Sequence, residues 1–175
     1  MNWHTNTLMV PSAISSVADR SSTASAAIIT TEDGGFLLQH RDEIPGIWFP
    51  GYWGLFGGAI DDNESPAEAL SRELGEELGL RADRMSYFTQ VCFDLRRWNL
   101  GVRLRYFFEV RTTRAQLEGL VLTEGQASKV LSGEEVLKMP RLTPYDRFAL
   151  GLYLTQHDLE AMRPILGSDD SATSG

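Results

Sequence analysis

Short blocks of alternating or repeating hydrophobic residues divide the chain into predicted elements. The run 25–31 is β-type, turn-forming residues follow at 33–35, and 36–41 is a second β-type run, so this region predicts a β-hairpin. Leu55 and Phe56 predict a short strand that ends at a glycine pair. Two more β-type runs, 87–95 and 102–110, are joined by a polar stretch.

The clearest helix signal lies between residues 65 and 79. Ser65 is a preferred N-cap residue, Pro66 suits the first helical position, and Glu68 completes a capping box. Leucines recur every four residues at 70, 74 and 78 and predict the buried stripe of the helix. Gly79 is expected to end it in a left-handed conformation. Gly75, inside the helix, is expected to cost up to about 1 kcal/mol relative to alanine.

Two further helices are predicted towards the C-terminus. Ser132 opens a short one, and Thr143 with Pro144 opens another, in which Phe148 and Leu152 are expected to face inward. Strands, a helix, more strands and then helices favour a mixed α/β layered domain.

The composition predicts one globular domain that buries its own core. The chain has 175 residues, of which 42% are hydrophobic and 23% charged. We expect this domain at 23–166, between a flexible Ser- and Thr-rich arm at 1–22 and a flexible tail at 167–175. A single cysteine, Cys92, excludes an internal disulfide and a multi-cysteine metal site, which predicts a reducing, cytoplasmic location.

The net charge of −8 narrows the classes of partner. A protein this acidic is a poor binder of nucleic acid polymers, whose phosphates carry dense negative charge. No apolar run approaches the roughly 20 residues of a membrane span, and no secretory signal is expected at the N-terminus. If such a chain acts on phosphates, it needs a metal cation between its own negative charge and theirs.

The predicted helix carries three carboxylates on one face. Glu73, Glu76 and Glu77 stand at positions i, i+3 and i+4 beside the leucine stripe. Like charges this close repel, and a divalent cation would relieve the repulsion; oxygen ligands suit Mg²⁺ or Mn²⁺ better than zinc. Arg72 could fix one carboxylate, and Glu64 could reach the same cluster. A solvated glutamate-rich surface is the competing interpretation.

The spacing of these residues resembles a known motif. Gly58, Glu64, Arg72-Glu73-Leu74, Glu76-Glu77 and Gly79-Leu80 match the Nudix box at every fixed position. The chain therefore resembles the Nudix hydrolase superfamily, of the MutT-like kind. The resemblance implies an α/β/α sandwich with a mixed β-sheet. It also implies Mg²⁺-dependent, or Mn²⁺-dependent, hydrolysis of a nucleoside diphosphate linked to another moiety.

The resemblance also implies roles for individual residues. Metal ligands would be Glu73, Glu76, Glu77 and the carbonyl of Gly57, with Glu64 supporting the site from its edge, and Arg72 would orient Glu73. In some members of the superfamily the general base is the glutamate that matches Glu73, and in others it comes from a later loop. Glu124 is the candidate here for the second case, and an exposed loop glutamate without a catalytic role is its alternative.

Specificity has to come from outside the motif. Trp48 and Tyr52 could stack on a base or cover a sugar, and Arg41 could contact phosphate. Arg103 and Arg105, which alternate with apolar residues, predict a solvated strand face, although they too could contact phosphate. Trp53 fits the core at least as well as a binding site.

Two function classes follow. The first is a pyrophosphohydrolase whose small-molecule substrate is a nucleotide sugar or a nucleoside triphosphate. The alternative is a non-catalytic Nudix-fold nucleotide sensor or scaffold, although such modules usually have eroded boxes and this one is complete. Members of the superfamily are often dimers, so a homodimer is expected.

Overall fold

The computed structural model describes residues 23–82, 85–99 and 101–166, so the predicted arm at 1–22 and tail at 167–175 lie outside the described residues. Its strands are β1 (Thr23–Thr31), β2 (Phe36–His40), β3 (Trp53–Gly54), β4 (Met85–Asp94), β5 (Val102–Thr112) and β6 (Ala127–Leu131). Its helices are α2 (Pro66–Leu78), α3 (Arg114–Glu118), α4 (Gly133–Lys138) and α5 (Pro144–Leu166), with a 3₁₀ turn η2 (Arg96–Trp98).

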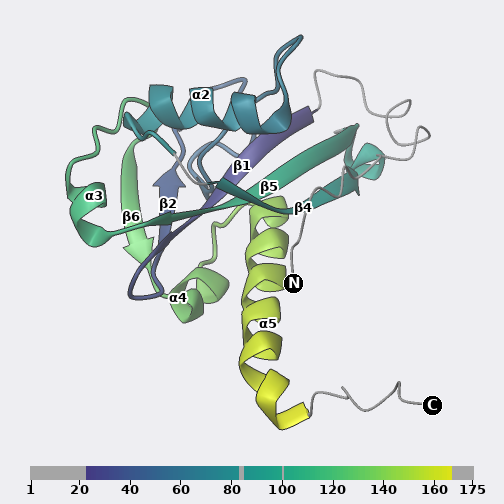
Figure 1. The fold of residues 1–175 in the computed structure, drawn as a ribbon. Helices are drawn as coiled ribbons and strands as arrows, with labels where there is room; N and C mark the ends of the chain where they lie inside the picture. The colour runs from purple at the N-terminus through teal and green to yellow at the C-terminus, as the bar shows by residue number, and fades with distance from the viewer. Residues whose placement is uncertain (1–22, 83–84, 100, 167–175) are drawn as a thin grey trace.

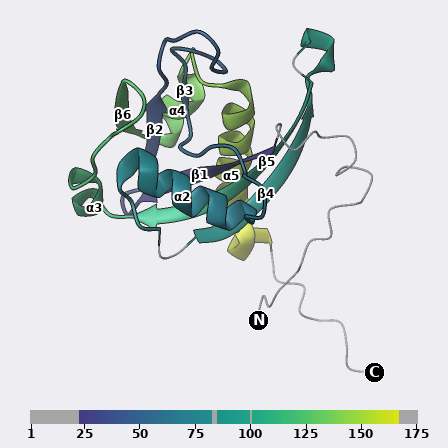
Figure 2. The ribbon, with the colours of Figure 1, turned by 90° about the horizontal axis from the view of Figure 1, so that it is seen from above.

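The strands form one mixed sheet in the order β3-β2-β1-β5-β4, and β6 pairs with β2. Strands β1 and β5 run parallel, from Thr23 opposite Leu104 to Thr31 opposite Thr112, whereas the other pairs are antiparallel. Helix α2 lies across one face of the sheet, and α4 and α5 lie on the other (Figure 1). The view from above shows the same layers (Figure 2). The predicted α/β/α sandwich with a mixed sheet is therefore confirmed.

Alternation along β1 separates two hydrophobic cores. Ala27 and Ile29 point towards the leucine stripe of α2, and Ala26 and Ile28 point towards α5. All four side chains are fully buried. Both faces of β1 are buried in hydrophobic cores, so the strand is held firmly within the sheet. It therefore fixes the position of the residues at its N-terminal end.

Some expectations fail in detail. Phe148 was predicted to face inward but is 52% exposed, because the buried face of α5 is made by Tyr145, Ala149 and Tyr153, and Phe148 lies beside that face. The short strand expected at 55–56 is Trp53–Gly54, although Phe56 does form a bridge with Ala27. No element was predicted at α3 or β6. No helix in the described part of the chain is both long and apolar enough to cross a membrane.

Candidate functional site at the edge of helix α2

Helix α2 begins and ends where the sequence predicts. The Ser65 side chain accepts a hydrogen bond from the Glu68 backbone N–H, and the Glu68 carboxylate accepts one from the Ser65 backbone N–H. Gly79 ends the helix with a left-handed φ of 64°. The three leucines of the stripe are buried against the sheet: Leu70 and Leu74 are 0% exposed, and Leu78 is 1% exposed. The rotation of the helix about its axis is thus fixed, and with it the direction of the carboxylates.

The carboxylates Glu73, Glu76 and Glu77, called here the acidic edge, differ widely in exposure. Glu77 is buried, at 5% exposure, whereas the side chain of Glu76 is 63% exposed. One Glu77 oxygen accepts a hydrogen bond of 3.0 Å from the backbone N–H of Gly57. Burial, followed by the charges of Glu124 and Glu73, outweighs that hydrogen bond and raises the pKa of Glu77 to about 7.

The glycine pair lets the backbone approach α2 closely. A Cβ on Gly57 would lie 2.3 Å from the carbonyl oxygen of Ser25, and Gly57 has a φ of 127° that other residues rarely adopt. A Cβ on Gly58 would lie 2.4 Å from the carboxylate carbon of Glu73. The backbone of Gly57 and Gly58 is therefore in direct contact with the acidic edge.

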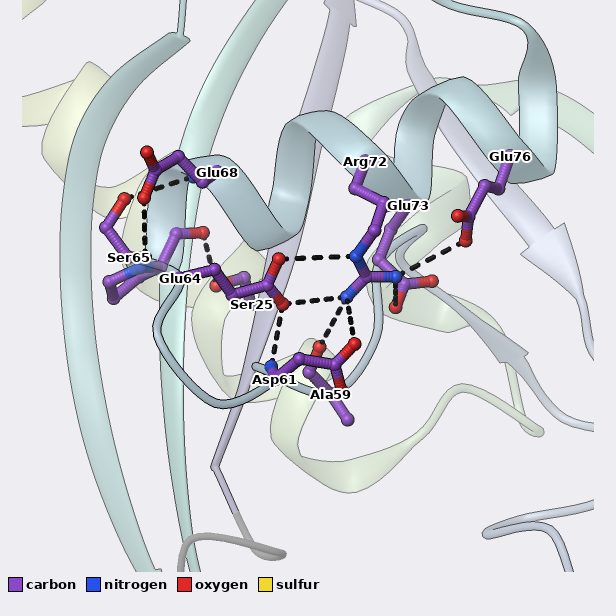
Figure 3. Close-up of polar contacts among 10 residues, drawn as sticks. Ser25, Ala59, Asp61, Glu64, Ser65, Glu68, Arg72, Glu73 and Glu76 are labelled. Carbon is purple, nitrogen blue, oxygen red and sulfur yellow. Dashed lines mark hydrogen bonds and ion pairs between the residues drawn. The ribbon is translucent and has the colours of Figure 1, made fainter.

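Arg72 connects the acidic edge to the loop before the helix (Figure 3). Its guanidinium makes two hydrogen bonds to Glu64, of 2.8 and 3.3 Å, and one bond each to Glu73 at 2.9 Å and Glu76 at 3.3 Å. It also donates to the carbonyl of Ala59 at 3.1 Å. Arg72 therefore binds Glu64 through two hydrogen bonds and Glu73 through one. These bonds raise the pKa of Arg72 and keep it charged.

Glu73 is the second carboxylate with an altered pKa. Burial raises its pKa, and the repulsion from Glu76 and Glu124 adds to this, so that the Arg72 hydrogen bond compensates only in part. Glu73 and Glu77 therefore both favour the protonated form more than a free glutamate does. The charge of Glu124 contributes to the raised pKa of both residues, so Glu124 lies close enough to interact electrostatically with the acidic edge.

The loop 119–126 brings Glu124 there by capping the C-terminus of α2. The backbone N–H groups of Val121 and Thr123 donate to the carbonyls of Leu78 and Glu77, and the Thr123 hydroxyl donates to the carbonyl of Glu76. These are carbonyls that a helix end leaves without partners. The Glu124 side chain is exposed. Sequence patterns gave no sign of this capping, because it depends on tertiary contacts.

The donor set of the acidic edge fits a hard divalent cation. Every candidate donor is an oxygen, and the pKa values of Glu73 and Glu77 are raised by burial and by the charges of neighbouring carboxylates. In the conformation described for 23–82, 85–99 and 101–166, no three His, Cys, Asp or Glu side chains are arranged as a ready metal site. Instead Glu73 is turned to Arg72 and Glu77 to the N–H of Gly57.

The glycine pair also lines a cavity of about 180 Å³, called here the arginine cavity. It is lined by Thr23, Ala24, Arg41, Trp48, Gly57, Gly58, Ala59, Arg103, Arg105 and Tyr145. The structure thus brings the predicted binding residues Arg41 and Trp48 together, whereas Tyr52 is not part of the lining. The solvated strand face predicted for Arg103 and Arg105 is wrong, because the side chain of Arg105 is only 15% exposed.

Trp53 and His40 belong to the framework of the site. Trp53 is half-buried against the core on the α5 side, and its ring stacks on that of His40 at 4.9 Å. Tyr52 packs against Phe49, with ring centroids 5.4 Å apart. These contacts fix the aromatic loop between β2 and β3 against the body of the domain.

Comparison with known proteins identifies the family of the chain. A model of the NUDIX domain matches residues 20–149, which include the sheet, α2 and the arginine cavity. The chain belongs to the NUDIX family. The recognition of the Nudix box at Gly58–Leu80 is thereby confirmed.

Individual relatives show how far this likeness extends. The nucleoside triphosphatase NudI of Escherichia coli O139:H28 is 47% identical over 47 residues, which span 27% of this chain and 33% of that relative. Among solved structures, the E. coli ORF135 protein has a TM-score of 0.61 and 31% identity, over 81% of this chain and 92% of that one. A MutT protein from Methanosarcina mazei Go1 has a TM-score of 0.65 and 26% identity, over 81% and 95%.

Proposed function

We propose that this NUDIX chain is a divalent-cation-dependent pyrophosphohydrolase that cleaves the phosphoanhydride bond of a nucleoside diphosphate linked to another group. The observation that carries the proposal is the acidic edge itself. Glu77 is buried and Glu73 half-buried there, beside a backbone segment without side chains, and burial together with the neighbouring charges raises the pKa of Glu77 to about 7. Such an arrangement costs stability, which is common at sites selected for catalysis.

We propose that Glu73, Glu76, Glu77 and the Gly57 carbonyl hold Mg²⁺, or Mn²⁺, with Glu64 at the margin. When bound, the cation would neutralise phosphate charge and activate water. Arg72 would keep Glu73 ionised and fixed in place through its 2.9 Å hydrogen bond. Either Glu73 or Glu124 would accept the proton of the attacking water, because both are carboxylates of the same electrostatic cluster.

Isosteric substitutions test the proposal. Glu73→Gln and Glu77→Gln should each lower kcat/KM by about 10²–10⁴-fold, because each removes a charge on which cation binding or proton transfer depends. Glu118→Gln, the same chemical change at an exposed position in α3, is the control. Product release from nucleotides in Mg²⁺ gives the rates, and circular dichroism checks the fold. Full activity in Glu77→Gln would refute the assignment.

The choice of base needs a separate comparison. If Glu124 is the base, Glu124→Gln should lower kcat while the Mg²⁺ dependence stays near that of the wild type. If Glu73 is the base and a ligand, Glu73→Gln should change both quantities.

A further inference from the structure

The arginine cavity carries more positive charge than its surroundings neutralise. Three guanidinium groups line it, and no Asp or Glu is among the lining residues that the structure describes. Within the described part of the chain only one of the three, Arg105, forms an ion pair, at 3.7 Å from Asp146. In a protein with a net charge of −8, such a concentration of arginine favours an anionic ligand.

Aromatic rings and a carbonyl hold the guanidinium groups in place. The guanidinium of Arg103 lies 4.1 Å from the ring centre of Trp48, and that of Arg105 lies 4.2 Å from the ring centre of Tyr145. Arg41 donates from Nε to the Trp48 carbonyl at 2.9 Å. A ring covers the flat face of a guanidinium but leaves the N–H groups at its edge free to donate. The ring faces so covered are not available to stack a nucleobase.

Arg105 is held from behind by a buried carboxylate. Among the described residues its buried Nε has no hydrogen-bond partner, nor has Oδ1 of Asp146, which is only 2% exposed. The other oxygen of Asp146 is held at 3.0 Å by the N–H of Leu55 and at 2.5 Å by the hydroxyl of Thr143. Buried polar groups in proteins are nearly always paired, and these two atoms belong to the same 3.7 Å ion pair, so Asp146 anchors the guanidinium of Arg105 behind the cavity wall.

The size and position of the cavity limit what it holds. At about 180 Å³ it is smaller than the roughly 300–1,000 Å³ of pockets that enclose whole ligands, so it accommodates a small group. Gly57 and Gly58 form part of its lining and also contact Glu77 and Glu73 of the acidic edge. The cavity and the acidic edge therefore adjoin the same backbone segment.

We propose that the arginine cavity binds a phosphoryl group of the substrate beyond the two that flank the bond to be broken. The substrate class is then a nucleotide with a third phosphate, such as a nucleoside triphosphate, rather than a nucleotide sugar whose distal group is neutral. Arg103 and Arg105 are the specificity-determining residues. This inference rests on the proposed function, because it assumes that a diphosphate lies at the acidic edge.

Matched substrate pairs test the proposal. Each of the four nucleoside triphosphates is compared with the corresponding nucleoside diphosphate glucose, so that only the distal group differs. The wild type should have the higher kcat/KM for triphosphates. Arg103→Gln and Arg105→Gln should each reduce the ratio by about 10- to 100-fold, the effect of one charge-assisted hydrogen bond. The control is Arg111→Gln, which changes a 75% exposed arginine of the same strand and should keep the ratio.

A second pair locates the third phosphate. Nucleoside 5′-diphosphates are compared with and without a 3′-phosphate on the ribose. A preference for the 3′-phosphate that Arg103→Gln removes would place the bound group on the ribose, and a preference for triphosphates alone would place it on the 5′ chain. The proposal would be overturned if the ratio of kcat/KM for triphosphates to that for nucleotide sugars were the same in the wild type and in both cavity variants. A wild-type preference for the sugars would also overturn it.

Binding without turnover separates this proposal from the proposed function. Calorimetric titration with inorganic tripolyphosphate in a chelator should show binding to the wild type and to Arg111→Gln, and binding at least about 10-fold weaker to Arg103→Gln. Absence of binding to the wild type would count against the cavity even if nucleotides are hydrolysed. Binding lost in Arg103→Gln, with no nucleotide hydrolysed, would support the cavity and refute the hydrolase. Because Arg105 packs against buried Asp146, Arg103→Gln remains decisive if Arg105→Gln does not fold.

Discussion

The acidic edge and the arginine cavity share the Gly57–Gly58 segment, yet they relieve the repulsion between like charges in different ways. At the acidic edge one cation, Arg72, contacts both Glu73 and Glu76, and the pKa of Glu77 is raised, first by burial and then by the charges of Glu124 and Glu73. Arginine has no such recourse, because its guanidinium stays protonated in proteins. In the cavity, aromatic rings cover the guanidinium groups of Arg103 and Arg105, and among the described residues only Arg105 has a carboxylate partner, Asp146. The comparison teaches that repulsion at the acidic edge is relieved by a proton or, as proposed, by a metal cation, whereas repulsion in the cavity is relieved, as proposed, by an anion.

Gly57→Ala should have the largest effect, because it disturbs the segment that both regions share. The added Cβ would lie 2.3 Å from the carbonyl oxygen of Ser25, at a φ of 127°. Strain and overpacking together should cost about 3 kcal/mol or more, which lowers Tm by about 6–12 °C in a domain of this size. Calorimetry measures this, and both nucleotide hydrolysis and tripolyphosphate binding should fail together.

Gly34→Ala provides the control for Gly57→Ala. Gly34 also has a positive φ, of 80°, but nothing lies within 4 Å of the added Cβ. It should cost only about 1 kcal/mol and spare both regions. If Gly57→Ala abolished hydrolysis but kept tripolyphosphate binding, the two regions would not depend on a common segment.

The pH dependence of stability should sharpen the contrast. The pKa of Glu77 is about 7 in the folded protein and 4.5 in a free side chain, so folding favours the protonated form. In a chelator, the stability that this proton gives is complete below pH 4.5 and lost as the pH rises through 7, by up to about 3 kcal/mol. Glu77→Gln should lose less stability over this range and be more stable than the wild type at pH 8. Urea unfolding from pH 4.5 to 8 measures the difference.

Glu118→Gln should have the same pH dependence of stability as the wild type, because Glu118 is an exposed residue of α3 and is distant from the acidic edge along the chain. Parallel curves for the wild type and Glu77→Gln would contradict the interpretation that burial raises the pKa of Glu77. The cavity variants Arg103→Gln and Arg105→Gln should show no additional change of stability with pH, because no arginine titrates in this range.

Helix α2 was predictable because every signal for it is local. Ser65, Glu68 and Gly79 act on residues within a few positions along the chain, so spacing alone determined the cap at each end. The leucine stripe likewise follows from helical period. The metal and catalytic roles inferred for the acidic edge remain predictions, since they concern a ligand rather than the chain.

The arginine cavity was only partly predictable because it is made of distant segments. Arg41 and Trp48 come from one loop, and Arg103 and Arg105 from a strand more than fifty residues later; alternation along that strand wrongly indicated a solvated face. What buries Arg105 is the ring of Tyr145 on α5, which periodicity within β5 does not reveal. Strand β6 was missed because its few apolar residues have no clear alternation.

Gly75→Ala should have the smallest effect and tests whether the acidic edge depends on the general stability of α2. Nothing lies within 4 Å of the added Cβ, so the substitution should stabilise the protein by about 0.5–1 kcal/mol and raise Tm by a few degrees without changing kcat/KM. Gly151→Ala is a matched change in α5, also in open space. If Gly75→Ala alone lowered activity, the carboxylates would need freedom in α2 to turn from Arg72 and Gly57 towards a cation. Equal, unchanged activities would mean that side-chain rotation alone brings them there.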